Sequence, residues 1–168
     1  MEINLASIRQ EYTKGGLRES ELPDNPFLLF SQWLQEAIDS KVDEPTAMLV
    51  GTVSPEGKPS TRTVLLKDLH DDKFIFYSNY ESRKGRQLAQ NPAISLSFVW
   101  HQLERQVHIE GTAEKVPPDE SDQYFKKRPY KSRIGALSDN ISVILPAERC
   151  ATGKMRQDGV ILDFAKSY

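Results

Sequence analysis

The chain has 168 residues and a formal net charge of −2, from 22 Lys and Arg residues against 24 Asp and Glu residues. This length is typical of one compact domain, and the near-neutral balance argues against a general nucleic-acid binder. The single cysteine, Cys150, excludes an internal disulfide framework and a cysteine-rich zinc site. Apolar stretches are only strand-sized and no signal peptide is recognisable, so we expect a cytoplasmic protein without a membrane span. We expect an N-terminal arm over residues 1–24 and one domain over residues 25–168.

The first regular element expected is an amphipathic helix from Pro26 to about Ser40. Asn25 can cap this helix, and proline is favoured at the first helical position. The apolar residues that recur at helical spacing are Phe27, Phe30, Leu34, Ala37 and Ile38. This helix therefore has one face suited to burial.

Short β-rich segments follow the helix and predict a barrel. The five segments are Ala47–Val53, Arg62–Lys67, Phe74–Tyr77, Ala93–Trp100 and Gln106–Ala113, and a turn at Ser54–Gly57 makes the first two a hairpin. Two helices are expected between and after them, over Ser82–Gln90 and from Pro117 to near Arg128, where Pro129 disfavours continuation. Near the end of the chain, Val160–Phe164 is strand-like.

The helix expected at Ser82 begins with two cations, Arg83 and Lys84, at the positive end of the helix dipole. An anion there would relieve the repulsion, and free amide donors with two long cationic side chains suit a phosphate. The alternative is a solvated surface pair.

A second candidate group lies on the strand before it. Alternation places Arg62 on one face with Val64 and Leu66, and Lys67 on the other. A mid-strand arginine beside apolar neighbours needs a partner if it is buried, whereas Lys67 can extend to water. Arg62 is therefore the more informative of the two cations.

A third group occupies the last expected helix. Tyr124 and Arg128 are four residues apart and share a helical face, so with the hydroxyl of Ser132 they could hold a second phosphate. The alternative is an exposed, lysine-rich helix end favoured by its dipole. No nucleophile motif or metal-ligand spacing accompanies these groups, which points to a cofactor that brings its own reactivity.

Several motifs in a fixed order resemble the pyridoxamine 5′-phosphate oxidase family over about residues 5–136. The motifs are Arg9–Leu17, Arg62–Lys67, Phe76–Asn79, Ser82–Lys84, Trp100–Val107 and Tyr124–Pro129. The resemblance implies a mainly β fold with flanking helices, the Greek-key, FMN-binding split β-barrel. It also implies a homodimer with FMN at the subunit interface.

The same resemblance implies the site residues. Those that would contact FMN are Arg62, Val64, Leu65, Lys67, Tyr77, Ser78, Arg83, Lys84 and Gln106. Those that would hold the substrate are Lys67, Tyr124, Arg128 and Ser132, with Arg9 and Tyr12 from the arm. The implied reaction oxidises pyridoxamine or pyridoxine 5′-phosphate to pyridoxal 5′-phosphate and reduces O₂ to H₂O₂. The flavin carries this chemistry, so no side chain is expected to be catalytic and no metal is expected.

The likeness fades after Gly135–Ala136. The family continues with a Trp, a Gln-Ser pair and later an Arg-x-His, but this chain has no Trp after Trp100 and no His after His108. Three interpretations stay open: another segment closes the pocket, flavin is held while turnover on the vitamin B6 phosphates is weakened or lost, or the carboxyl end is truncated or frame-altered. The alternatives to an oxidase are a non-catalytic FMN- or pyridoxal-phosphate-binding protein and a split-barrel flavin enzyme with another substrate.

Overall fold

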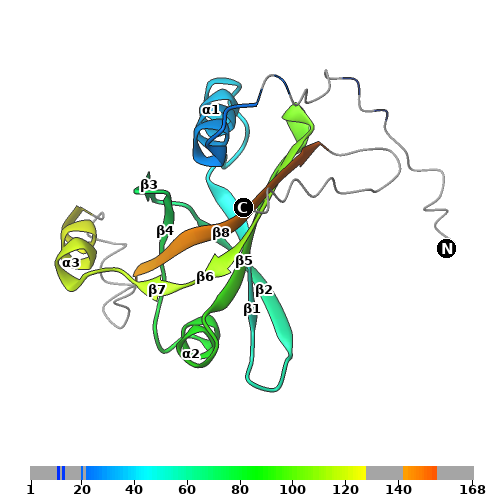
Figure 1. Ribbon diagram of the computed structural model, residues 1–168. Helices are drawn as coiled ribbons and strands as arrows, with labels where there is room; N and C mark the ends of the chain where they lie inside the picture. Colours follow the sequence, from blue (N-terminus) through cyan, green and yellow to red (C-terminus); the bar gives the residue numbers. More distant parts are fainter. Residues whose placement is uncertain (1–10, 12, 14–19, 21, 128–141, 155–168) are drawn as a thin grey trace, which may run out of the picture.

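The computed structural model describes residues 11, 13, 20, 22–127 and 142–154 (Figure 1). Its helices are α1 (Pro26–Asp39), α2 (Arg83–Gln90) and α3 (Pro118–Lys127), with a short 3₁₀ helix, η3 (His101–Leu103). Its strands are β1 (Ala47–Val53), β2 (Pro59–Leu65), β3 (Asp68–His70), β4 (Lys73–Tyr77), β5 (Ala93–Trp100), β6 (Arg105–Thr112), β7 (Glu114–Lys115) and β8 (Ser142–Lys154). This set of helices and strands confirms the expected mainly β class with flanking helices. None of the helices in the described part has the length and hydropathy needed to cross a membrane.

Helix α1 begins where the sequence predicts. The Asn25 side chain accepts a hydrogen bond from the backbone N–H of Phe27 at 2.8 Å, and Pro26 occupies the first helical turn. The buried face consists of Leu29, Phe30, Trp33 and Ala37. Ile38 was expected on this face, but it is 44% exposed, because one residue after the buried Ala37 the helix has turned by about 100° away from the sheet.

The strands form one antiparallel sheet in the order β2-β1-β5-β6-β8-β4-β3, with β7 paired to β8. The expected hairpin is confirmed as β1–β2. The expected bounds of its second strand, Arg62–Lys67, are wrong: pairing starts at Pro59, directly after the turn, and ends at Leu65. The expected alternation on this strand is confirmed, since Ser60, Arg62 and Val64 are half-buried while their neighbours Thr61 and Thr63 are exposed.

Strand β8 is the largest element that sequence analysis missed, and where five strands were expected, residues 22–127 and 142–154 form eight. It pairs with β6 along one part of its length and with β4 and β7 along another, so it joins the two halves of the sheet (Figure 1). The expected strand at Val160–Phe164 lies outside the described residues. The division into an arm over residues 1–24 and one domain over residues 25–168 stays a prediction.

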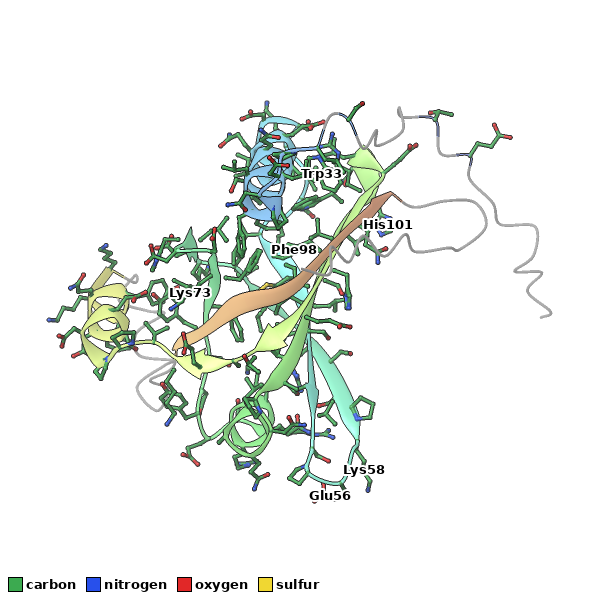
Figure 2. The ribbon with its side chains drawn as sticks, in the orientation of Figure 1. Trp33, Glu56, Lys58, Lys73, Phe98 and His101 are labelled. Carbon is green, nitrogen blue, oxygen red and sulfur yellow. The ribbon has the colours of Figure 1, made fainter. Side chains whose placement is uncertain are left out.

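An aromatic cluster fills the core between α1 and the sheet. The Phe30 ring packs edge-on against Phe74 and Phe98, with both centroid distances 4.9 Å, and lies 6.0 Å from Trp100. All four side chains are at most 1% exposed. Figure 2 shows Phe98 beneath the helix that carries Trp33. This cluster holds α1 on the sheet, and the candidate site lies away from it around α2.

Candidate functional site

The start of α2 is built as the sequence predicts. Ser82 caps the helix: its Oγ accepts a hydrogen bond from the N–H of Gly85 at 3.2 Å and donates one to the carbonyl of Asn79 at 2.5 Å. The first turn carries Arg83 and Lys84 and no acidic residue. The positive end of the helix dipole therefore coincides with two positive side chains.

Arg62 lies on β2, and its side chain is held by the β1–β2 hairpin. Its guanidinium donates to the carbonyl of Val50 at 3.2 Å, to Oγ1 of Thr52 at 2.7 Å and to Oγ of Ser60 at 2.8 Å. A guanidinium has five N–H donors, so at least two are left without an acceptor among the described residues. Burial, and after it the positive charge of Arg83, lowers the pKa of Arg62.

Arg62 and Arg83 form a like-charge pair without a carboxylate. Within the described ranges, no Asp or Glu makes an ion pair with either guanidinium, and the exposed Arg83 makes no hydrogen bond there. Two cations held close together favour a multiply charged anion between them, and an arginine fork matches two phosphate oxygens. The donor set therefore fits the phosphate of a nucleotide such as FMN.

The remaining residues predicted at the cofactor lie on or next to four elements, α2, β2, β4 and β6. Lys84 is half-buried, with its Nζ 3.4 Å from Oγ of Ser82. Lys67 lies just beyond β2, exposed, and its side chain contacts no acceptor in the described part of the chain. The other predicted FMN contacts have half-buried side chains: Val64 and Leu65 on β2, Tyr77 and Ser78 at the end of β4, and Gln106 on β6.

Gln106 lies far from Arg62 within the sheet. In the sheet order β6 is three strands from β2, which at a strand spacing of ~4.8 Å is a separation of about 14 Å. Within the sheet, Gln106 thus lies apart from the predicted phosphate contact Arg62.

Two tyrosines predicted at different ligands are in contact. The ring of Tyr77, at the end of β4, stacks on that of Tyr124 from α3, with centroids 3.5 Å apart and an interplanar angle of 7°. This stack brings the predicted substrate residue Tyr124 to the edge of the predicted cofactor group. The other predicted substrate residues, Arg9, Tyr12, Arg128 and Ser132, lie outside the described residues.

Helix α3 is also linked to the β3–β4 turn. His70 Nε2 lies 3.6 Å from a carboxylate oxygen of Glu120, and its Nδ1 lies 3.2 Å from Asp71. The hydrogen bond to Asp71 is the main cause that raises the pKa of His70, and Asp68 and Glu120 add to it. The contact between His70 and Glu120 links the β3–β4 turn to the helix that carries Tyr124.

Sequence analysis missed the polar residues behind Arg62. Thr52 and Gln87 are 1% and 5% exposed, and within residues 22–127 they are the buried polar side chains. The one signal available was the position of Arg62, because a half-buried arginine requires acceptors. Which residues supply them depends on how α2 packs against the hairpin.

Comparison with known proteins identifies the family of the chain. Residues 34–165 match the family model described as pyridoxamine 5′-phosphate oxidase. A protein of Bacteroides thetaiotaomicron named pyridoxine/pyridoxamine 5′-phosphate oxidase is 82% identical over 133 residues, which are 79% of this chain and 62% of that protein. A Porphyromonas gingivalis protein of the same name is 55% identical over 81% of this chain and 64% of its own length. This chain thus spans about three fifths of the length of these relatives.

Solved structures share the fold at low sequence identity. PhzG from Burkholderia lata, in complex with tetrahydrophenazine-1-carboxylic acid, superposes with a TM-score of 0.75 at 20% identity, over 87% of this chain and 89% of that one. A pyridoxamine 5′-phosphate oxidase-related, FMN-binding protein from Nostoc punctiforme gives 0.65 at 16% identity, over 80% and 87%. These likenesses confirm the expected split-barrel fold. By the family match and the identity to its relatives, the chain belongs to the pyridoxamine 5′-phosphate oxidase family.

Proposed function

We propose that this protein is an FMN-dependent oxidase that converts pyridoxamine or pyridoxine 5′-phosphate to pyridoxal 5′-phosphate, with O₂ reduced to H₂O₂. Membership of the family supports an oxidoreductase with FMN as its cofactor. The expected cytoplasmic location remains a prediction.

The observation that carries this proposal is the pair of guanidinium groups at the start of α2. Hydrogen bonds to the hairpin hold the Arg62 guanidinium in place before any ligand binds. Arg83 adds a second positive charge without a described acidic partner. In the proposed complex Arg62, Arg83 and Lys84 bind the phosphate of FMN. Val64, Leu65, Tyr77 and Ser78 then lie along the rest of the cofactor.

The separation between Gln106 and Arg62 supports a homodimer. Gln106 lies three strands from Arg62 within one sheet, too far for both side chains to bind the phosphate of the cofactor. A second copy of the chain supplies Gln106 from its own β6. We therefore place FMN at the interface of two protomers.

The substrate side of the proposed site comprises Lys67 and Tyr124, with Arg128, Ser132, Arg9 and Tyr12. Lys67 is exposed at the end of β2 without a described partner for its ammonium group, which leaves it available for a phosphate. Tyr124 offers a phenolic hydroxyl beside the Tyr77 ring. The phosphate of FMN and the phosphate of the substrate would thus be bound by separate cations.

When bound, FMN supplies the redox chemistry: it takes a hydride equivalent from C4′ of the substrate and passes two electrons to O₂. The protein contributes orientation, because the phosphate contacts hold each ring system in one position relative to the other. None of the described side chains is needed as a nucleophile. The expected rate enhancement is thus mostly that of positioning.

The absorbance spectrum of the purified chain tests the proposal. After addition of FMN and removal of the excess, the protein is expected to retain a visible flavin band. Anaerobic addition of pyridoxamine 5′-phosphate is expected to bleach this band as pyridoxal 5′-phosphate forms, and air is expected to restore it with production of H₂O₂.

Each other outcome of this experiment identifies a different function. A yellow protein that saturating substrate does not bleach is a flavin-binding protein without this activity. Bleaching by NAD(P)H alone indicates a split-barrel enzyme with another substrate. A colourless protein that does not bind added FMN would contradict both the cofactor and the reaction.

Replacing Tyr124 by phenylalanine tests the substrate side. The ring and its stack on Tyr77 are retained, while the hydroxyl that would bind the substrate phosphate is lost. We expect the KM for pyridoxamine 5′-phosphate to rise about 10-fold, the effect of one hydrogen bond to a charged group, with FMN affinity unchanged. Steady-state kinetics measure the first quantity and flavin fluorescence titration the second. An unchanged KM would remove Tyr124 from the substrate site.

A further inference from the structure

Gln87 ties α2 to both strands of the β1–β2 hairpin. Its side chain is 5% exposed, and its Oε1 accepts a hydrogen bond from Oγ1 of Thr52 at 2.7 Å and another from Oγ of Ser60 at 2.9 Å. Thr52 belongs to β1 and Ser60 to β2. A single amide oxygen thus joins three elements, one of which starts with Arg83 and Lys84.

The direction of each of these hydrogen bonds follows from Arg62. A guanidinium only donates, and Arg62 donates from Nη1 to the Thr52 hydroxyl at 2.7 Å and from Nη2 to the Ser60 hydroxyl at 2.8 Å. Each hydroxyl accepts from Arg62 and therefore turns its own proton toward Gln87. The amide must present its oxygen there, because its nitrogen would meet both hydroxyl protons.

This arrangement explains why the residue at position 87 is a glutamine. It accepts two hydrogen bonds, as a carboxylate would, but carries no charge. A carboxylate there would neutralise Arg62 from within and compete with an external anion. With the neutral amide, Arg62 is held rigidly and keeps its positive charge for a ligand.

We propose that Gln87 is a positioning residue for the phosphate end of the cofactor site. Through Thr52 and Ser60 it holds the Arg62 guanidinium in one orientation and sets the start of α2 relative to it, so that the phosphate meets a preformed set of donors. This inference rests on the proposed function, because the anion is taken to be the phosphate of FMN. Gln87 itself does not touch the cofactor.

The test compares FMN with riboflavin, which has the same ring system but no phosphate. Wild-type protein, Gln87→Met and Gln87→Glu are titrated with each flavin, with quenching of flavin fluorescence as the readout. Methionine keeps the volume and removes the acceptor, so FMN is expected to bind about 10-fold more weakly while riboflavin binds as it does to the wild type. Glutamate keeps both hydrogen bonds and the thermal stability, but FMN affinity is expected to fall at least as far.

Gln90→Met is the matched control, since Gln90 is exposed on the same helix. It should leave both affinities unchanged. A double-mutant cycle then asks whether Gln87 acts through Arg62. In an Arg62→Met background, Gln87→Met is expected to cause no further loss of FMN affinity.

The outcomes separate this inference from the function on which it rests. A wild-type protein that does not bind FMN would overturn both. If the wild type binds FMN and Gln87→Met binds it equally well, only the role of Gln87 is overturned. Equal losses of FMN and riboflavin affinity, or additive losses in the double-mutant cycle, would show a general structural role in place of the positioning role.

Discussion

Replacing Arg83 and Lys84 together by alanine is expected to weaken FMN binding by roughly 100-fold or more. Each side chain is proposed to make a charge-assisted contact to the cofactor phosphate, and such contacts contribute about 1.5–3 kcal/mol each. Arg83 is exposed, so solvent screening places its single substitution near the lower limit, about 10-fold. We expect a similar loss for Lys84→Ala alone.

The same double substitution is not expected to lower the thermal stability of the ligand-free protein. Arg83 repels Arg62, which is the second cause of the lowered pKa of Arg62, and both substituted cations lie at the positive end of α2. Their removal relieves this repulsion. The thermal stability of the apoprotein should therefore be unchanged or slightly higher, while FMN affinity falls.

Fluorescence titration with FMN and thermal unfolding without it measure the two effects. Lys58→Ala is the control, because Lys58 is an exposed cation at the tip of the β1–β2 hairpin (Figure 2). It removes a positive charge from the same region of the chain without touching α2. Wild-type FMN affinity in the Arg83 and Lys84 double variant would show that the cofactor phosphate binds elsewhere.

The second large effect is expected at Phe30, on the buried face of α1. Phe30→Ala should destabilise the fold by about 3–5 kcal/mol, the usual range for removal of a buried phenylalanine. The ring is 0% exposed and contacts Phe74, Phe98 and Trp100, so its loss leaves a cavity lined by rigid aromatic rings that cannot collapse into it. At about 2–4 °C per kcal/mol for a chain of this size, the melting temperature should fall by some 6–20 °C.

Leu28→Ala is the matched control on the same helix. Leu28 is 56% exposed, and its substitution should change the free energy of unfolding by no more than about 0.5 kcal/mol. Denaturant unfolding of the two variants measures the difference. Equal stability of the two variants would mean that α1 does not pack on the sheet through Phe30.

Local chemistry was sufficient to predict several elements. Asn25 and Pro26 mark the start of α1, and strict alternation identifies β5, where every second side chain is buried. The helix expected over Ser82–Gln90 is α2, with Arg83 and Lys84 in its first turn. In each case the signal lies within a few neighbouring residues, because capping and alternation are properties of the local backbone.

The hydrogen-bond partners of Arg62 could not be predicted from local sequence. Its need for a partner was evident, but the partners are two hydroxyls and, behind them, the amide of Gln87, which comes 25 positions later in the chain. No local pattern links these residues. Only the packing of α2 against the hairpin brings them together.

Strand β8 is a whole element that local sequence patterns did not predict. Its sequence includes Pro146, which lacks a backbone N–H, and its residues do not alternate as a long strand should. It is a strand because the free edges of β6 and β4 both pair with it.

The sequence by itself determined the helix starts, the β1–β2 hairpin, the core strands and the group of cations that suits a phosphate. The tertiary structure decided the strand order, the contact between Tyr77 and Tyr124, and the neutral network that holds Arg62. The physical reason is range: helix caps and alternation depend on adjacent residues, whereas strand pairing and buried hydrogen bonds depend on segments that meet only when the whole chain has folded.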